Sequence, residues 1–336
     1  MDCFCLANNY PAFLSELSGN TVPMKVGATT LEEQAWCRWF GREVYQGIGA
    51  VVEWGPWLGS LTESYCEGFE KNEALAGKNQ FVHIYDLFKW VSIFESWAGN
   101  SVHAGRFREG DDFYQYFCGL HRAREQILNI HQADLSRENW SGQPIEWIVN
   151  DAVKSLAIGT NVFQKWVPCM IPGKSWIAHQ DYLWSNNSFL QVYMYLMRDC
   201  FVYEYTIPNS CMVVFKNVKE SDPRVLVGNG VANQTLSLEL IEDTFEWSER
   251  ILTGVNPKLL ALCHSATLRD FGFLNEARQI VVDHKLTGRT QDPMIDYQLN
   301  ILRSWGYSDI LAPGGQPETY PWKKSRRFFP YFFKGP

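Results

Sequence analysis

The sequence of 336 residues lacks any apolar run long enough to cross a bilayer. A membrane-spanning helix needs about 20 consecutive apolar residues, and no uninterrupted apolar stretch reaches that length. Residues 1–17 also lack the basic region followed by an apolar core that is typical of a secretory signal. These absences predict a soluble, cytoplasmic protein that does not interact with membranes.

Paired cysteines and an excess of basic charge are also missing. The nine cysteines are scattered singly apart from Cys3 and Cys5 and show no CxxC spacing, which favours reduced thiols over a disulfide framework or a zinc site. The net charge is −7, whereas a general nucleic-acid binder needs a basic face that displaces counterions from phosphates. A short basic patch at 323–327 is confined to the tail. We therefore expect no nucleic-acid partner.

Apolar and aromatic residues are abundant. Hydrophobic residues make up 46% of the chain, so it can bury a sizeable core. Aromatic residues make up 15% and include 14 tryptophans. Large rings dominate core burial, and the expected place for most of them is the core. A site for a sugar or another flat acceptor, lined by some of these rings, stays open as an alternative.

Short β-type runs alternate with helical stretches in the central part of the chain. We expect strands over 49–56, 81–88, 127–135, 145–152 and 175–182, a hairpin over 203–218, and helices over 60–72, 153–168 and 188–201. The stretch between the second and third strands contains Gly99, Gly105 and Gly110 and is expected to be loop-like. Strands separated by helices predict an α/β fold with a mostly parallel sheet, helices on both faces and an antiparallel edge hairpin.

The flanks of this central domain, which we place at 48–220, are predicted to be helical. Residues 1–47 form a helical lead-in with one helix over 31–46, and 236–311 form a C-terminal α-helical appendage. The appendage is expected to contain helices over 238–252, 257–272, 273–288 and 292–306, and to pack beside the carboxyl ends of the strands. Residues 312–336 form a tail rich in basic and aromatic residues.

The first candidate motif joins the first strand to the following helix. Ligands of open α/β sheets bind outside the carboxyl ends of the strands. The run from Glu53 to Ser60 places Gly55, Trp57 and Gly59 there. Glycines let the backbone approach a ligand closely, and the amino terminus of a helix offers free N–H groups. The pattern is E-x-G-x-x-x-G, and it lacks the third glycine of the dinucleotide fingerprint G-x-G-x-x-G.

Acidic residues follow the next two strands. Asp86, followed by Leu87 and Phe88, ends the second strand about 30 residues after Gly55, where a carboxylate can accept bonds from both ribose hydroxyls. Asp134, followed by Leu135, comes after the third strand.

These three motifs together resemble class I S-adenosylmethionine-dependent methyltransferases. The resemblance implies a Rossmann-like fold for the central domain, with S-adenosylmethionine as the cofactor and Asp134 beside its adenine amino group. It implies that the cofactor contacts Glu53, Gly55, Trp57, Gly59, Ser60, Asp86, Leu87, Phe88, Asp134, Leu135 and Asp151.

Two further motifs concern the reaction. The D-x-x-K pattern of Asp151 and Lys154 follows the fourth strand, and His179-Gln180-Asp181 ends the fifth. D-x-x-K resembles catechol-type metal-dependent O-methyltransferases, and the wider run from 144 to 182 is similar to the macrocin O-methyltransferase family. The resemblance implies a Mg²⁺ ion on Asp151 and Asp181, with Lys154 as a base of lowered pKa. Gln180 stands where those families often have an acid, which leaves open a metal-free scheme with His179 as the base.

The sequence therefore predicts an S-adenosylmethionine-dependent O-methyltransferase. Its acceptor would be a hydroxyl of a small molecule, such as a sugar or a glycosylated natural product. Two alternatives stay open: a nicotinamide-dependent oxidoreductase, which the missing third glycine disfavours, and a non-catalytic interaction protein on the same fold. The oligomeric state also stays open, with a homodimer among the options.

Overall fold

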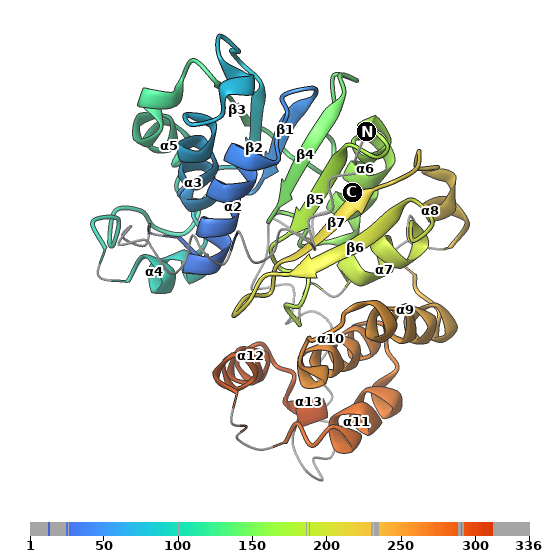
Figure 1. Ribbon diagram of the computed structural model, residues 1–336. Coiled ribbons are helices and arrows are strands. Elements are labelled where there is room, and N and C mark those ends of the chain that lie inside the picture. The colour runs from blue at the N-terminus through green and yellow to red at the C-terminus, as the bar shows by residue number, and fades with distance from the viewer. Residues whose placement is uncertain are drawn as a thin grey trace.

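The fold is built around one seven-stranded sheet (Figure 1). The computed structural model describes residues 13, 25, 27–99, 101–185, 187, 189–229, 231, 235–287, 290 and 292–311. The strands are β1 (Ala50–Trp54), β2 (Val82–Asp86), β3 (Leu128–Gln132), β4 (Ile145–Asn150), β5 (Ser175–His179), β6 (Phe201–Thr206) and β7 (Val213–Asn217). Their order is β3-β2-β1-β4-β5-β7-β6, and β7 pairs antiparallel with both of its neighbours while the other pairs are parallel. The predicted α/β, Rossmann-like fold with an antiparallel edge hairpin is confirmed.

Alternate residues of each central strand enter two separate cores. Along β1, Val52 and Trp54 belong to one core and Val51 to the other. The same alternation separates Ile148 from Val149 in β4. Because side chains point to opposite faces with a period of two, a strand covered on both faces is apolar throughout.

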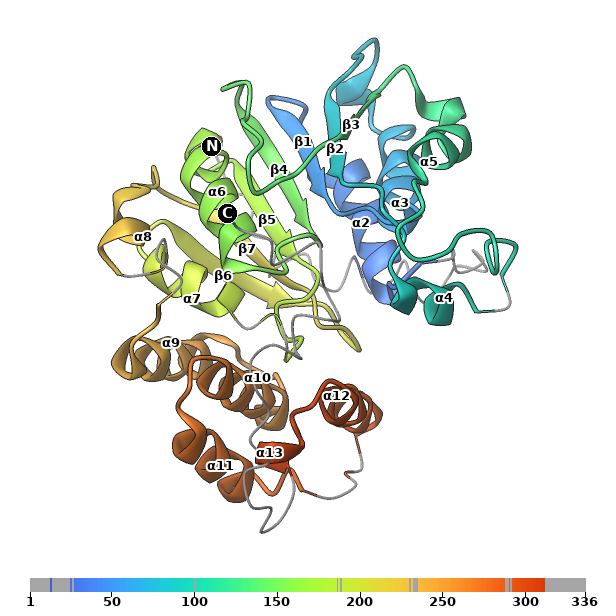
Figure 2. The ribbon, with the colours of Figure 1, turned by 180° about the vertical axis from the view of Figure 1, so that it is seen from behind.

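Helices cover both faces (Figures 1 and 2). One face carries α2 (Leu31–Glu43), α3 (Ser60–Phe69), α4 (Ser92–Ala98) and α5 (Tyr114–Leu120), and the other carries α6 (Leu156–Lys165), α7 (Phe189–Leu196) and α8 (Arg224–Gly228). Short 3₁₀ turns lie at η1 (Glu73–Leu75), η2 (Arg122–Arg124) and η3 (Val167–Cys169). The helices predicted over 31–46, 60–72, 153–168 and 188–201 correspond to α2, α3, α6 and α7, which are shorter.

The lead-in helix α2 is part of the core of the sheet domain. Thr30 caps its first turn, and the Glu33 side chain returns a bond to the Thr30 backbone, so that the pair forms a capping box. Further along, Phe40 packs on Trp147 of β4 with ring centroids 4.3 Å apart. Many of the tryptophans are accounted for by this packing of α2 and α3 on the sheet.

The stretch between β2 and β3 contains α4, α5 and η2, so our prediction of a loop there is wrong. The glycines end or separate these short helices: Gly99 caps α4 at its carboxyl end with a positive φ of 51°. The helices form because Trp90, Phe94, Phe113 and Phe117 bury their rings in the same core as α3. The burial of these rings outweighs the low helix propensity of the sequence.

The C-terminal segment is helical, as predicted, and shares the core of the sheet. It contains α9 (Leu238–Ile251), α10 (Pro257–Asp270), α11 (Leu274–Asp283), α12 (Pro293–Ser304) and the unpredicted α13 (Ser308–Leu311). Residues of α9 to α13 belong to one continuous apolar cluster with β4, β5, β7, α6 and α7. In the described part of the chain no helix is long and apolar enough to span a membrane. The basic-aromatic tail predicted for 312–336 lies outside the described residues.

Candidate active site at the carboxyl edge of the sheet

Backbone hydrogen bonds bring the predicted motifs side by side along one edge of the sheet. Four backbone hydrogen bonds of 2.8–2.9 Å each join the residue that follows one strand to a residue at the end of the neighbouring strand. The N–H groups are donated to carbonyls in the pairs Ala133 to Asp86, Gly55 to Tyr85, Asp151 to Trp54 and Gln180 to Asn150. Residues about 100 apart in sequence therefore become neighbours, which is the arrangement that ligand sites of open α/β sheets use.

The loop after β1 requires its two glycines. Gly55 and Gly59 have φ of +77° and +80°, the left-handed region that glycine adopts without strain. A Cβ on Gly55 would lie 3.0 Å from the backbone N of Ala152, and one on Gly59 would lie 2.2 Å from Nε2 of the buried His121. Gly59 is the N-cap of α3 and has no side chain to cap its N–H groups, so backbone donors stay available at this end of the helix.

Glu53 stabilises the connection between β1 and the helix that follows this loop. Its carboxylate accepts bonds from the hydroxyls of Thr62 at 2.6 Å and Tyr65 at 2.7 Å, which ties β1 to the first turns of α3. Burial raises the pKa of Glu53 to about 7. Ser60, at the start of α3, bonds through its hydroxyl to Thr29 at 2.8 Å. The structure thus gives both side chains protein partners.

Three other predicted contact residues use their side chains in the core. The Trp57 ring packs with Phe94 and Trp97, the Phe88 ring packs with Phe117, and Leu135 is buried in the core on the α6 face. Trp57 and Phe88 also have positive φ, of 48° and 51°. These three residues would therefore contact a cofactor through their backbone. The contact of Leu87 with the cofactor stays a prediction.

Asp86 lies at the end of β2, next to the end of β1. Its carboxylate accepts the backbone N–H of Phe88 at 2.7 Å. Burial raises the pKa of Asp86 to about 6, although the nearby backbone N–H groups of Phe88, Trp57 and Leu87 favour the ionised form. Asp134, in contrast, is exposed, and its Oδ1 accepts the hydroxyl and the N–H of Ser136 at 2.6 and 2.9 Å.

Asp151, Lys154 and Asp181 form one bridged cluster. Lys154 Nζ lies 2.8 Å from Asp151 Oδ1 and also donates to Asp181 Oδ2, which accepts the Asn187 amide at 2.8 Å. All three charged side chains are partly exposed, by 21–25%. The turn that presents Asp151 is fixed by Asn150, whose Oδ1 accepts the N–H of Val153 at 3.2 Å. The structure thus brings these three predicted residues together.

The protonation of this cluster differs from our prediction for Lys154. Burial lowers the pKa of the Lys154 ammonium, but the neighbouring carboxylates of Asp151 and Asp181 outweigh it and raise the pKa above its ordinary value. Lys154 is therefore an ammonium group, and the prediction of a lowered pKa is wrong for this arrangement. Burial raises the pKa of Asp151 to about 7, with Lys154 opposing and Asp181 adding to the rise. Asp151, like Glu53, thus has a proton affinity that matches neutral pH, and unlike Glu53 its side chain is partly exposed.

The residues present do not fit the predicted Mg²⁺ site. Mg²⁺ requires near-octahedral oxygen ligands at about 2.0–2.1 Å. Here the Lys154 ammonium bonds to both predicted ligands, Asp151 and Asp181. Gln180 does not supply the charge of the missing acid: its Nε2 donates to the Ala28 carbonyl at 2.7 Å, and its buried Oε1 accepts no hydrogen bond from the described residues. Within the described ranges, no group of three or more His, Cys, Asp or Glu residues is arranged to hold a metal ion.

His179 is a core residue, so its predicted role as a base is wrong. Its ring is fully buried, with Nδ1 2.8 Å from the Asn150 amide nitrogen and Nε2 3.4 Å from Met194 Sδ. Burial lowers the pKa of His179 to about 3. A neutral imidazole whose two nitrogens face protein partners has no path to an acceptor proton.

The sequence analysis missed Glu33 of α2. This carboxyl group is buried, accepts the Thr30 N–H at 2.8 Å and accepts the hydroxyl of Ser210 in the turn between β6 and β7. Burial raises the pKa of Glu33 to about 8, and Asp181 and Asp151 lie near enough to contribute. The T-x-x-E capping box at 30–33 was the available signal, but it predicts a helix start and not a place beside the site.

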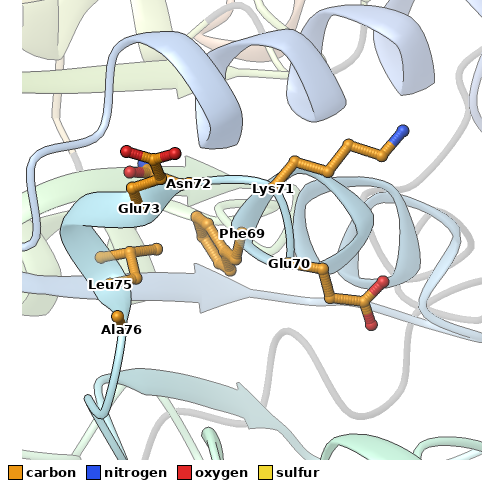
Figure 3. A pocket seen from close by; sticks show the side chains of 7 residues that line it. All are labelled: Phe69, Glu70, Lys71, Asn72, Glu73, Leu75 and Ala76. Carbon is orange, nitrogen blue, oxygen red and sulfur yellow. The ribbon is translucent and has the colours of Figure 1, made fainter.

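An open depression elsewhere has no part in this site. It is lined by residues at the end of α3 and in the following turn, from Phe69 to Ala76 (Figure 3). The Asn72 amide closes this turn by donating to the carbonyls of Gly41 and Tyr45 at 2.8 and 2.7 Å. Since α3 begins at the carboxyl edge of the sheet, its far end lies away from the acidic strand ends.

No family model matches the chain, and no curated protein matches it. Three solved structures are similar to it. The calicheamicin methyltransferase CalS11 is 13% identical, with 62% of this chain and 91% of that chain covered and a TM-score of 0.42. The 23S rRNA methyltransferase ErmE is 13% identical, with coverage of 81% and 96% and a TM-score of 0.34. Human N-acetylserotonin methyltransferase in complex with SAM is 10% identical, with coverage of 63% and 66% and a TM-score of 0.30. Likenesses at this level identify neither a family nor an activity for this chain.

Proposed function

We propose that the protein is an S-adenosylmethionine-dependent methyltransferase. The observation that carries the proposal is the position of Asp86 at the end of β2, beside the Gly55–Gly59 loop that follows the neighbouring strand β1. A carboxylate at this position, beside a glycine loop and the free N–H groups of a helix, suits a ribose with an adjoining chain. The mostly parallel sheet with its antiparallel β7 agrees with the Rossmann-like fold that the resemblance to class I methyltransferases implies.

The cofactor side of the site would use mainly backbone groups. Gly55, Gly59 and the start of α3 would hold the methionine end, and Asp86 would accept the ribose hydroxyls. Asp134 would lie beside adenine through the carboxylate oxygen that Ser136 does not engage. Acidic side chains with raised pKa values crowd this edge, and a sulfonium cofactor brings the complementary positive charge. A dinucleotide carries a pyrophosphate instead, which these acids would repel.

The acceptor side would use Asp151, Lys154 and Asp181. Methyl transfer breaks the bond between the methyl carbon and sulfur, whose electron pair stays on sulfur, while the acceptor oxygen forms the new bond to carbon. Positioning supplies most of the acceleration of such an in-line displacement. Asp151, with a pKa of about 7, would take the acceptor proton and release it to solvent. No step requires a metal ion, and no step uses His179.

The finer assignments belong to this proposal as well. The acceptor would be a hydroxyl of a small molecule, such as a sugar or a glycosylated natural product, as in the macrocin O-methyltransferase family. The net charge of −7 favours such an acceptor over a nucleic acid. We also place the protein in the cytoplasm on the grounds given by its cysteine pattern.

Calorimetry with S-adenosylmethionine, S-adenosylhomocysteine and NAD tests the proposal. We expect micromolar binding of the first two, about −8 kcal/mol, and none of NAD. Asp86→Ala should weaken binding by about 1.5–3 kcal/mol, as for lost hydrogen bonds to a charged group. Asp283→Ala, on the exposed face of α11, is the matched control and should bind normally. Binding of NAD alone would refute the proposal.

A further inference from the structure

We propose that the Lys154 ammonium is the resident cation of the acceptor site, in the place that Mg²⁺ takes in metal-dependent O-methyltransferases, and that it binds the acceptor oxygen directly. The inference rests on the proposed function. It replaces both the metal ion and the lysine base with one permanently charged side chain.

The first argument is the position of Nζ between the two carboxylates. It lies 2.8 Å from Asp151 Oδ1 and bonds to Asp181 Oδ2. The Asn187 amide holds Asp181 from the other side, 2.8 Å from the same Oδ2. These groups come from the ends of β4 and β5 and from the segment before α7. A bound cation is usually surrounded by oxygen ligands that come from separate loops. Here the cation is the Nζ ammonium group of Lys154.

The second argument is the donor count. A lysine ammonium has three N–H donors. Two of them serve Asp151 and Asp181, and the third has no partner among the residues that the structure describes. The Lys154 side chain is 25% exposed, so this donor is accessible to a ligand. A free N–H on a fixed positive charge is suited to a hydroxyl oxygen on which negative charge develops during methyl transfer.

The third argument concerns the other side-chain oxygens nearby that could coordinate a metal ion. Glu33 accepts bonds from Thr30 and Ser210. Gln180 donates through Nε2 to the Ala28 carbonyl, and its buried Oε1 has no hydrogen-bond partner among the described residues. An entering Mg²⁺ would gain only this uncharged oxygen without breaking a contact, and it would also meet the charge of Lys154. The local structure therefore favours the lysine ammonium over a divalent ion.

The chemical consequence is a different acceptor preference. A divalent ion can chelate two adjacent hydroxyls, as on a catechol, whereas one free N–H binds a single oxygen. In the reaction the N–H of Lys154 holds the acceptor oxygen and keeps its own proton, and the hydroxyl proton passes to a carboxylate of the cluster as the carbon–oxygen bond forms. An acceptor with one hydroxyl should therefore suffice, and a vicinal diol should offer no advantage.

The test is Mn²⁺ binding, followed by electron paramagnetic resonance and calorimetry, in the full-length protein. The wild type should bind no Mn²⁺ at this site, and its turnover should be the same in EDTA and in added Mg²⁺. Lys154→Ala vacates the position between Asp151 and Asp181 and should bind one Mn²⁺ at least about tenfold more tightly than the wild type, because the two carboxylates are left without their cation. Lys154→Gln replaces it if the alanine variant does not fold. Lys165→Ala, on the exposed side of α6, is the control and should behave as the wild type.

Two outcomes would overturn the inference. One is a wild-type Mn²⁺ site that disappears in Asp151→Asn, because an ion would then displace the lysine. The other is a folded Lys154 variant that binds no Mn²⁺, because the carboxylates would then form no cation site. Failure of the proposed function is separate, since it would appear as absent S-adenosylmethionine binding in the wild type whatever the Mn²⁺ result.

Discussion

The Lys154 ammonium lies 2.8 Å from Asp151 Oδ1, and each of these groups favours the charged form of the other. Burial opposes this effect and raises the pKa of Asp151 to about 7. In the function that we propose, Asp151 accepts the proton and Lys154 is a fixed positive charge, whereas the sequence predicts Lys154 as the base.

Asp151 should govern the pH dependence of turnover. Only its ionised form accepts a proton, so kcat/KM should rise as the pH passes about 7 and level off above it. Asp151→Asn should lower kcat by about 10²–10⁴-fold, the range of a lost general base, and should remove this rise. Rate profiles between pH 5 and 9 for the wild type and Asp151→Asn measure both effects. A variant with the wild-type profile would show that another group takes the proton.

Gly59→Ala should destabilise the protein strongly. The new Cβ would lie 2.2 Å from His121 Nε2 at a φ of +80°, so overpacking adds to backbone strain. We expect a loss of about 2–4 kcal/mol, measured by urea unfolding. Gly77→Ala is the matched control: its φ is +76° but nothing lies within 4 Å of the added Cβ. It should cost only about 1–2 kcal/mol, the strain of a left-handed residue. Equal losses in the two variants would contradict the close packing of His121.

Glu33 should make stability fall as the pH rises. Burial raises its pKa from 4.5 to about 8 in the folded protein, so between these values the folded state holds a proton that the unfolded state has released. The free energy of unfolding then decreases with pH across this window. In Glu33→Gln this contribution is absent.

The Glu33→Gln variant should therefore match the wild type below pH 4.5 and gain on it above. The gain is at most about 1.4 kcal/mol for each pH unit up to 8. Denaturant unfolding at pH 4, 6 and 8 measures the difference. Glu239→Gln, at the start of α9, where Glu239 is exposed, is the control. A constant difference between Glu33→Gln and the wild type at all pH values would rule out the raised pKa.

Gln298 should couple the C-terminal helices to the site. It is fully buried in α12, accepts the Ser185 N–H and donates to the Leu183 carbonyl, both at 2.9 Å. Gln298→Leu removes both of these buried hydrogen bonds, and we expect a loss of about 1–3 kcal/mol, since each hydrogen bond contributes about 0.5–1.5 kcal/mol.

The same variant should lower turnover more than cofactor affinity, because the 183–185 segment follows Asp181. Gln279→Leu, on the exposed side of α11, should change neither quantity. Thermal unfolding, calorimetry with S-adenosylmethionine and turnover distinguish these effects. A Gln298→Leu protein with full turnover would show that α12 stabilises the fold without shaping the site.

The order of strands and helices and the residues at the strand ends could be predicted from the sequence by itself. Apolar β-branched runs that end in glycine or an acid, such as the one from Gly49 to Glu53, carry this information locally. Parallel pairing then forces the ends of β1, β2, β4 and β5 to one edge, so that Asp86, Asp151 and Asp181 are neighbours whatever their side chains do. Periodicity also predicted α9 to α12, because each of these helices buries one face.

Only the tertiary structure decided what each of these side chains does. His179 is a core residue because Phe163, Met194 and Phe215 surround it, and none of them is near it in sequence. Asp151 and also Asp181, which is 27 residues later, lie beside Lys154 and favour its charged form. Glu33 is bonded to Ser210, 177 residues away, and lies near Asp181 and Asp151. A local sequence pattern determines the path of the backbone. Burial and neighbouring charges determine the pKa and the partners of a side chain, and they depend on residues that only folding brings together.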